Sequence, residues 1–225
     1  MRVLGLIPAR GGSQGIPRKN LVPLGGRPLL AWTLEAAQGS TRLTHVVVST
    51  DDDEIAAAAR EAGVEVLERP PALAGHDTPM RDVVLHALDE LGGAEVVVLL
   101  QPTSPLRRAE HVDEAIALLE ETGADCVVSV VEVPHAYRPS SLMELRDGRL
   151  EPLDPAVYAT RDEKPLVYAR NGPAVLAARA EGLRERTQLH GGDCRPYVMD
   201  ARDSIDIDGP FDLELAELLL AGRPA

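Results

Sequence analysis

The stretch that most constrains the fold is a glycine-rich loop between a buried strand and a helix. Residues 3–7 form an apolar run with the length and β-branching of a buried strand. Apolar residues with helical spacing begin at Leu29, and Gly39 can cap the end of that helix. The loop between them contains the sequence Ile7-Pro8-Ala9-Arg10-Gly11-Gly12-Ser13-Gln14-Gly15-Ile16-Pro17-Arg18-Lys19-Asn20. A strand, a long loop and a helix in this order are the start of an α/β protein.

The chemistry of this loop suits a polyphosphate. Its glycines let backbone N–H groups converge on one point and admit a ligand close to the main chain. The loop also carries cationic and neutral polar side chains, which are Arg10, Arg18, Lys19, Ser13 and Asn20. The chain has a net charge of −13, yet residues 1–34 contain no Asp or Glu, which indicates local anion binding. The alternative is a solvated surface loop that carries its arginines by chance.

Two common phosphate-binding loops do not fit this stretch. A Walker loop ends in Gly-Lys-Ser/Thr, whereas this loop ends in Arg18-Lys19-Asn20. A dinucleotide fingerprint needs Gly-x-Gly-x-x-Gly, and Arg10 stands where its first glycine would be. The loop therefore belongs to another class of phosphate site.

The rest of the first half alternates buried strands with amphipathic helices. The expected strands are residues 46–50, 64–67, 96–100 and 127–131, and the expected helices that follow the first three are residues 52–60, 80–91 and 110–121. Asp52 or Asp53 can cap the first of these helices, which we prefer to a metal site for the acidic run 51–53. Short connections between such elements predict a doubly wound, mostly parallel sheet covered on both faces, a Rossmann-like fold in a single domain over residues 1–225.

The pattern changes between residues 132 and 170. Asp147-Gly148 lies between two short runs with alternating apolar residues, as in a β-hairpin. We interpret this segment as an insertion into the sheet. After it, the chain should rejoin the sheet, add short strands at residues 197–199 and 204–208, and end in a helix that begins at Gly209-Pro210.

Asp206 and Asp208 are the strongest candidates for a metal site. In a strand, residues two apart point to the same face, so both carboxylates would project together. Two converging carboxylates are a common protein contribution to a Mg²⁺ site shared with substrate phosphates. The alternative is that Asp208 caps the last helix and Asp206 is merely exposed. The spacing alone leaves both interpretations open.

Composition excludes several classes of partner. Strong negative charge and an aromatic content of 3% argue against binding to nucleic acid. Proteins bind its phosphates through basic surfaces and its unpaired bases through aromatic side chains. No apolar run approaches the roughly 20 residues that span a bilayer, and we expect neither a membrane partner nor a signal peptide. Cys126 and Cys194 follow no metal-ligand spacing and are expected to be small packing groups in a reduced, cytoplasmic protein.

The N-terminal loop resembles the signature loop of the acylneuraminate cytidylyltransferases, with Gln14 where lysine is usual. Four further motifs match that family in order: Arg69-Pro70 with Asp77-Thr78; Leu99-Leu100-Gln101-Pro102-Thr103-Ser104-Pro105-Leu106-Arg107; Arg170-Asn171-Gly172; and Ser204-Ile205-Asp206-Ile207-Asp208 followed by Asp212-Leu213. The resemblance covers residues 3 to about 213, which is nearly the whole chain.

This resemblance implies transfer of CMP from CTP to a nonulosonic, sialic-type acid, with release of pyrophosphate. It implies nucleotide binding by Ala9, Arg10, Gly11, Gly12, Ser13, Lys19, Asn20, Arg69, Thr78 and Pro79. It implies sugar binding by Gln101, Ser104, Arg170 and Asn171. It further implies Mg²⁺ at Asp206 and Asp208, catalytic roles for both and for Arg10 and Lys19, and a homodimer formed through the insertion at about 132–170.

Departures from the family pattern leave the acceptor open. Gln14 removes one cation from the triphosphate loop, and Val175 stands where many sialic acid enzymes have tyrosine. The alternatives are a nucleotidyltransferase that uses another acidic acceptor or another nucleotide, and a non-catalytic nucleotide-binding module. Retention of Lys19, Asp206 and Asp208 argues against the last of these.

Overall fold

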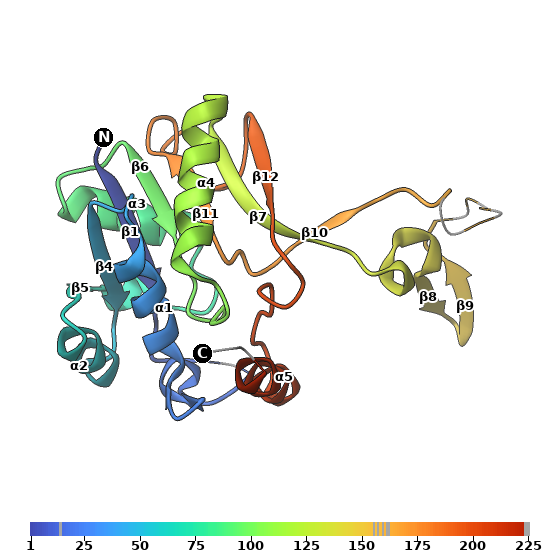
Figure 1. The fold of residues 1–225 in the computed structure, drawn as a ribbon, viewed down its shortest axis with the longest axis horizontal. Coiled ribbons are helices and arrows are strands. Elements are labelled where there is room, and N and C mark those ends of the chain that lie inside the picture. The colour runs from blue at the N-terminus through green and yellow to red at the C-terminus, as the bar shows by residue number, and fades with distance from the viewer. Residues whose placement is uncertain (14, 155, 157, 159, 161–162, 223–225) are drawn as a thin grey trace.

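The computed structural model describes residues 1–13, 15–154, 156, 158, 160 and 163–222. Within these residues, the central sheet has eight strands, which are β1 (Val3–Pro8), β4 (His45–Thr50), β5 (Glu65–Glu68), β6 (Val96–Leu99), β7 (Cys126–Glu132), β10 (Tyr168–Arg170), β11 (Leu176–Arg179) and β12 (Cys194–Val198). The five described helices are α1 (Leu29–Gly39), α2 (Asp53–Glu61), α3 (Met80–Glu90), α4 (Ala109–Thr122) and α5 (Pro210–Ala221). Figure 1 shows the strands at the centre with the helices around them.

The sheet has a parallel core and a mixed edge. Strand β1 lies between β4 and β6, and all its pairs are parallel, as is the pair β4–β5. The chain that returns from the insertion enters between β6 and β7 as β11, which is antiparallel to both. Strand β10 is also antiparallel to β7, and β12 pairs with β7 in parallel. The α/β prediction is confirmed, with antiparallel strands added where the insertion rejoins the sheet.

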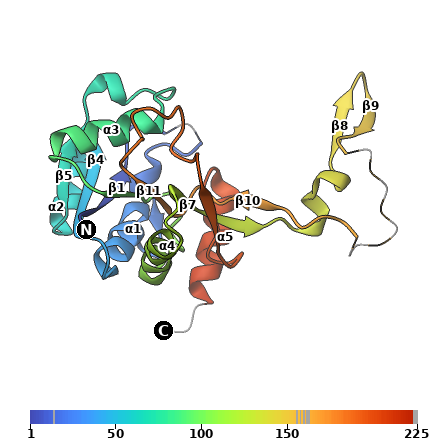
Figure 2. The same ribbon diagram turned by 90° about the horizontal axis from the view of Figure 1, so that it is seen from above.

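Helices cover both faces of the sheet because its strands alternate between two apolar cores. Val3 and Ile7 of β1 pack on the side of α1, α2 and α4, whereas Leu4 and Leu6 pack on the side of α3. Figure 2 shows α3 across the sheet from α1 and α4. A third, smaller cluster joins α5 to the short hairpin of β2 (Pro23–Leu24) and β3 (Arg27–Pro28).

The predicted strand at residues 204–208 is wrong. This segment pairs with no strand of the sheet, because its backbone is bonded to loops and side chains instead. The N–H of Ile207 donates to the carbonyl of Thr103, and the N–H of Asp208 donates to the Asp212 carboxylate. The alternation of apolar residues nevertheless has a structural meaning, since Ile205 and Ile207 both pack in the cluster under α5.

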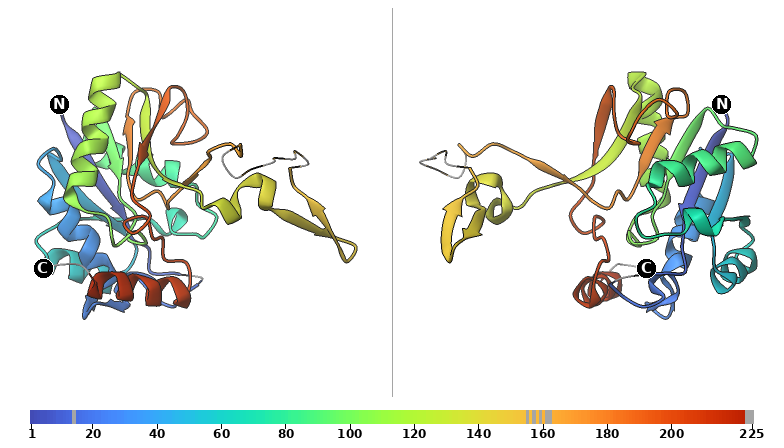
Figure 3. Two further views of the ribbon diagram at one scale, coloured as in Figure 1. Left: turned by 45° about the vertical axis from the view of Figure 1, so that its right-hand side comes forward. Right: turned by 180° about the vertical axis from the view of Figure 1, so that it is seen from behind.

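The insertion forms an arm that leaves the body of the molecule between β7 and β10. Its hairpin consists of β8 (Met143–Arg146) and β9 (Arg149–Pro152), a two-stranded sheet of its own. Asp147 and Gly148 both have positive φ, 49° and 77°, as a tight hairpin turn requires. The arm stands away from the sheet in both views of Figure 3. Parts of the insertion, at residues 155, 157, 159 and 161–162, lie outside the described residues.

Candidate active site

The first of two adjoining cavities has a volume of about 390 Å³ and lies at the carboxyl ends of β1 and β6. Four loops line it, those after β1, β5 and β6 and the one before α5. The lining residues are Pro8, Arg10, Ser13, Gly15, Lys19, Asn20, Arg69, Leu73, Gly75, His76, Thr78, Met80, Val83, Gln101, Pro102, Thr103 and Asp208. Ligands bind at this edge in open α/β sheets because loops from several strands converge there.

The glycine-rich loop is held by its own side chains and by the acidic run after β4. The Asn20 amide donates to the carbonyl of Arg10 at 2.9 Å, which closes the loop on itself. The N–H of Gly11 donates to the Asp51 carboxylate at 3.0 Å, so this N–H group is already occupied in the free protein. Asp52 caps α2, as predicted, and pairs with Arg18. These bonds tie the described parts of the loop, on either side of residue 14, to each other and to the segment after β4 in the free protein.

The structure divides the predicted nucleotide-binding residues into two groups. Arg10, Ser13, Lys19, Asn20, Arg69 and Thr78 line the first cavity. Ala9, Gly11, Gly12 and Pro79 do not. Ala9 is fully buried and donates its N–H to Ser49, and Gly12 is exposed outside the cavity. Gln14, the departure from the family loop, lies outside the described residues.

Lys19 joins the loop to the aspartate segment. Its ammonium donates to the carbonyl of Ile207 at 2.6 Å and lies 3.5 Å from the Asp208 carboxylate. Gly15 touches the same segment, because a Cβ at this position would lie 2.0 Å from the carbonyl oxygen of Asp208. Only glycine permits this approach. The cationic loop and the aspartates are thus brought together, although they are almost 190 residues apart in the sequence.

Asp206 and Asp208 lie in different surroundings. Asp206 is largely enclosed, and burial raises the pKa of its carboxyl above the ordinary value, with the nearby Asp208 acting in the same direction. A hydrogen bond from Thr103 and the charge of Lys19 oppose that shift only in part. Among the described residues, Oδ1 of Asp206 has no hydrogen-bond partner. The Asp208 side chain, by contrast, is 86% exposed.

Asp208 does not cap α5. Asp212 does, because its carboxylate accepts from the N–H groups of Asp208 and Gly209 at 3.0 and 2.8 Å. Helix α5 begins after Gly209, with Pro210 in its first turn. The capping interpretation of Asp208 is therefore excluded, and its carboxylate is left pointing into the first cavity beside Lys19.

Arg69 forms part of the first cavity wall from a buried position. Its Nε donates to Ser49 Oγ at 3.1 Å and its Nη2 to the carbonyl of Ser49 at 2.7 Å. Burial lowers the pKa of the guanidinium to about 10, with Asp51 opposing the shift and Arg10 adding to it. The bonds to Ser49 fix the orientation of the guanidinium at the rim of the loop over residues 69–79.

The second cavity, of about 310 Å³, shares Met80 and Gln101 with the first. Its remaining lining residues are Pro79, Arg81, Leu99, Arg170, Gly172, Pro173, Leu176, Thr187, Gln188, Leu189 and His190. Arg170 from β10 lies 3.4 Å from the ring nitrogens of His190. None of the described lining residues is Asp or Glu, so this cavity favours an anion although the protein as a whole is acidic.

Two predicted sugar-binding residues lie behind the cavities rather than in them. Ser104 is fully buried, and Asn171 is 3% exposed. The Asn171 amide donates to Ser204 Oγ at 2.9 Å and accepts from Ser129 Oγ at 2.6 Å. It therefore connects β7 to the segment that carries Asp206. Val175, the second departure from the family pattern, is fully buried in the core on the α4 side and lines neither cavity.

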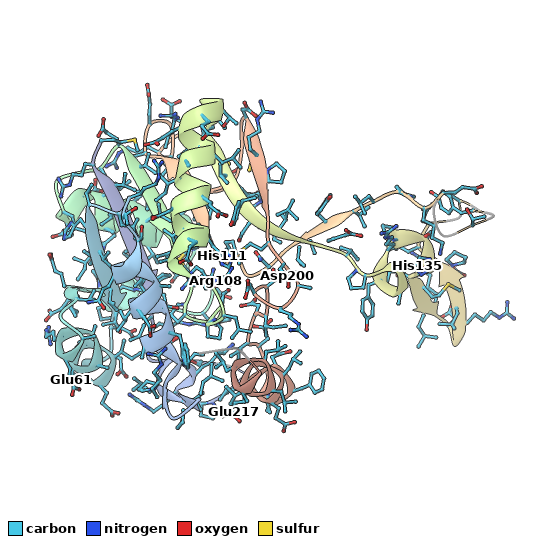
Figure 4. All side chains as sticks on the ribbon, viewed as in Figure 1. Glu61, Arg108, His111, His135, Asp200 and Glu217 are labelled. Carbon is cyan, nitrogen blue, oxygen red and sulfur yellow. The ribbon has the colours of Figure 1, made fainter. Side chains whose placement is uncertain are left out.

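The sequence did not indicate the positioning roles of Arg108 and His111, nor that of Arg107, which it showed only as the last residue of a family motif. Arg108 and His111 at the start of α4 pair with Asp203 at 3.3 and 3.5 Å, which anchors the turn before Asp206. Figure 4 labels Arg108 and His111 and also Asp200, whose carbonyl accepts from the N–H of Asp203 in that turn. Arg107 is buried and donates to the carbonyls of Gln101 and Ala174, next to the second cavity. Most of these contacts join segments that are far apart in the sequence, so a local sequence pattern does not predict them.

The described residues contain no cluster of three or more His, Cys, Asp or Glu side chains that could hold a metal by themselves. Two carboxylates near each other fit a cation only if a ligand supplies further oxygens. No helix among the described residues is long and apolar enough to cross a membrane.

A cationic glycine-rich loop beside the Asp208 carboxylate, next to a second cavity lined by Arg170, is an arrangement that suits the binding of a nucleoside triphosphate on an α/β sheet. The sequence matches the family described as Cytidylyltransferase over residues 4–202. The protein belongs to this cytidylyltransferase family of enzymes, which confirms the resemblance found in the sequence.

Relatives agree with this assignment. An N-acylneuraminate cytidylyltransferase of Escherichia coli is 33% identical over 217 residues, which cover 96% of this chain and 51% of that protein. The chain thus spans about half the length of that relative and of a similar one from Danio rerio. A CMP-N,N′-diacetyllegionaminic acid synthase of Legionella pneumophila is 34% identical over 98% of this chain and 97% of its own length.

Solved structures share the fold at lower identity. A CMP:2-keto-3-deoxy-manno-octonic acid synthetase in complex with CTP superposes with a TM-score of 0.75 at 20% identity, covering 98% of this chain and 99% of that one. A 4-diphosphocytidyl-2C-methyl-D-erythritol synthase from Anaerococcus prevotii gives 0.63 at 14% identity, with 98% of each chain covered. These likenesses establish the nucleotidyltransferase fold.

Proposed function

We propose that the protein transfers CMP from CTP to a nonulosonic acid and releases pyrophosphate. The observation that carries the proposal is the pair of cavities that meet at Gln101. One contains the cationic loop and the Asp208 carboxylate, and the other is lined by Arg170 and His190, with no Asp or Glu among its described lining residues. This arrangement suits a nucleoside triphosphate beside an acidic acceptor. The relatives that act on sialic and legionaminic acids support the same class of acceptor.

In this reaction a hydroxyl of the acceptor attacks the α-phosphorus of CTP, and the bond to pyrophosphate breaks. Arg10, Ser13 and Lys19 bind the phosphate oxygens and neutralise their charge. Phosphoryl transfer depends mainly on such positioning and electrostatic stabilisation. Arg170 holds the acceptor's carboxylate, and Gln101 lies where acceptor and nucleotide meet. Arg69 and the backbone at Thr78 recognise the cytosine ring.

Asp206 and Asp208 are the residues that would hold Mg²⁺. The buried Oδ1 of Asp206, which has no partner among the described residues, and the exposed carboxylate of Asp208 would fit a cation that takes its remaining ligands from phosphate oxygens and water. When bound, the ion supplies charge neutralisation for the triphosphate. Lys19 contacts Asp208 in the free protein and is placed to share the phosphates with that site.

Ser104 and Asn171 act behind the sugar rather than on it in this proposal. Ser104 Oγ donates to the carbonyl of Asn171 at 3.4 Å, and Asn171 in turn holds Ser204, two residues before Asp206. Their bonds set the relative positions of the acceptor cavity and the aspartates. The arm at about 132–170 forms the homodimer interface.

The experiment is a pyrophosphate-release assay with each of the four nucleoside triphosphates and a panel of acidic sugars. We expect turnover with CTP and a nonulosonic acid, and little with UTP, ATP or GTP. Lys19→Ala should lose most of this activity while keeping the melting temperature. Equal turnover with all nucleotides would contradict the cytosine assignment. Binding of CTP without turnover on any acceptor would favour the non-catalytic module instead.

A further inference from the structure

The two cysteines of the chain lie opposite each other on neighbouring strands. Cys194 of β12 is the register partner of Cys126 on β7. Both face the apolar core on the α3 side of the sheet, where Cys126 is fully buried and Cys194 is partly exposed. Both side chains are free thiols and lie next to each other across the strand pair. Because the two cysteines are far apart in the sequence, the sequence alone does not show that they are neighbours.

The strand geometry matches the requirements of a disulfide. Neighbouring strands lie about 4.8 Å apart, and the Cα atoms of a disulfide are usually about 4.4–6.8 Å apart. Register partners on parallel strands also direct their side chains to the same face of the sheet, as the shared core of Cys126 and Cys194 demonstrates. The two sulfur atoms can therefore be joined without moving either strand to a new register.

We propose that Cys126 and Cys194 form an intramolecular disulfide when the protein meets a low-molecular-weight disulfide such as oxidised glutathione. The partly exposed Cys194 reacts first, as a thiolate, and displaces one glutathione thiol to give a mixed disulfide. Cys126 then attacks the sulfur of Cys194 and displaces the second glutathione. The protein loses two hydrogen atoms, and one glutathione disulfide is reduced to two thiols.

The first step is slow at neutral pH because little of the Cys194 thiol is ionised. Burial and the contact with Cys126 raise the pKa of Cys194 to about 12, and Asp193 adds to this shift whereas Arg186 opposes it. Arg186 is itself paired with Asp125 at the start of β7. The rate should rise about tenfold per pH unit below that pKa, since the thiolate is the nucleophile.

Disulfide formation also affects the second cavity. The Cys126 thiol lies 3.7 Å from the carbonyl of Gly191 and donates a hydrogen bond to it. Gly191 directly follows His190, which lines that cavity. Oxidation removes the thiol hydrogen and with it this anchor of the loop over residues 187–191. The consequence for the acceptor rests on the proposed function, whereas the disulfide itself does not.

The test treats the protein with oxidised glutathione at about pH 8.5, where more thiolate is present. Intact mass, thiol titration after denaturation and a non-reducing gel are then measured. We expect the wild type to lose both thiols and two hydrogen masses and to remain a single chain, with full reversal by dithiothreitol. Cys126→Ala should instead retain one glutathione on Cys194, because the second step is blocked. Cys194→Ala is the matched control and should keep its Cys126 thiol.

Two outcomes would overturn the proposal. One is a wild type that stops at the mixed disulfide, as Cys126→Ala does. The other is a bond formed between chains. For the loop, hydrogen exchange at residues 187–191 and the KM for the acceptor should both rise on oxidation of the wild type but not of Cys194→Ala. Unchanged exchange would refute the link to the loop. Absence of pyrophosphate release before oxidation would count against the proposed function alone, since mass and thiol counts still decide the disulfide.

Discussion

The carboxylate of Asp206 is enclosed by the protein, and its Oδ1 has no hydrogen-bond partner among the described residues. Gly172 leaves room for it, because a Cβ there would lie 3.1 Å from that oxygen and 2.7 Å from Ser104 Oγ. A buried carboxylate oxygen without a hydrogen-bond partner destabilises a fold, and perturbed groups of this kind cluster at functional sites. Single residues of this kind give the sharpest tests of the site.

The first prediction concerns Asp206→Asn. In the absence of metal, this variant should melt about 2–4 °C higher than the wild type, the shift that roughly 1 kcal/mol gives in a chain of this size, because a buried charge is removed. With Mg²⁺ and CTP present, ligand binding should raise the melting temperature of the wild type and leave the variant nearly unchanged. Its turnover should be almost lost.

Asp208→Asn separates the metal role from a structural one. Asp212 caps α5, so this substitution should change the free energy of unfolding of the free protein by no more than about 0.5 kcal/mol, as for other exposed sites. We expect the same loss of Mg²⁺-dependent stabilisation and of turnover. A variant that kept full turnover would refute the metal assignment of Asp208.

The second prediction concerns Arg107, which positions the acceptor side of the site. Its Nη1 donates to the carbonyls of Gln101 and Ala174 at 3.1 and 2.7 Å, and its Nη2 donates to Thr33 Oγ1 at 2.6 Å. It is 3% exposed, and burial lowers the pKa of its guanidinium to about 9. Arg107→Lys cannot keep all three bonds, because lysine lacks the planar fork.

We expect Arg107→Lys to raise the KM for the acidic sugar by about tenfold, which corresponds to ~1.4 kcal/mol of binding, with a smaller change for CTP. Thr33→Val is the matched control, since it removes only the contact with α1. The measurement is a pair of KM determinations for each variant. An equal loss for both substrates with a fallen melting temperature would indicate general destabilisation instead of positioning.

At the scale of elements, the helices and buried strands could be predicted from the sequence because each carries its own period. Helix α2, with its Asp52 cap, and the hairpin at Asp147-Gly148 follow local rules that hold in the structure. The segment at residues 204–208 shows where such local prediction fails. Apolar and polar residues do alternate in it, but a strand also needs a neighbouring strand to pair with. Here the backbone N–H groups bond to a loop carbonyl and a side-chain carboxylate instead.

The candidate site likewise has residues that local sequence patterns predict and residues that only tertiary packing places. The glycine-rich loop concentrates charged and polar residues in one stretch of sequence. Arg10, Ser13 and Lys19 could therefore be predicted as binding residues, and they line the first cavity. Whether a motif residue faces the ligand or the core depends on packing, which the sequence does not encode locally. Ser104 and Asn171 are motif residues that face inward, and His190 carries no motif yet lines the second cavity.

The third prediction concerns the start of α4. The backbone N–H of Arg108 donates to His111 Nδ1 at 3.1 Å, so this nitrogen must be unprotonated. Burial first, and then the charge of Arg108, lower the pKa of His111, although Asp203, Glu114 and Glu110 oppose the shift. The ordinary pKa of a histidine is 6.5. At a pH below this value, His111 binds a proton more readily in the unfolded chain than in the folded protein.

Stability from His111 is therefore present at neutral pH and declines as the pH falls below 6.5 towards the lowered pKa. We expect the free energy of unfolding of the wild type to fall more steeply in this range than that of His111→Gln, by at most about 1.4 kcal/mol per pH unit, the limit for one proton. Urea denaturation at several pH values measures the difference. Parallel curves for the two proteins would contradict the mechanism.

At the scale of the whole molecule, the arm is the feature that exposes apolar side chains when the chain is alone. Leu145 and Leu150 are register partners in the β8–β9 hairpin and are 70% and 65% exposed. Met143 and Pro152 lie on the same face, because residues two apart in a strand share a face. A two-stranded hairpin is marginal by itself, and an exposed apolar face of this kind is usually covered by a partner.

The last prediction is that two copies of the chain bury these arms against each other or against each other's bodies. Light scattering at micromolar concentration should give twice the mass of one chain, since a closed pair is the commonest way to cover such a surface. Leu145→Glu places a charge in the apolar face and should shift the protein towards the monomer. Arg149→Glu changes a charge on the opposite face of the same hairpin and should leave the dimer intact. A monomeric wild type, or equal dissociation of both variants, would show that the apolar face of the arm is not the interface.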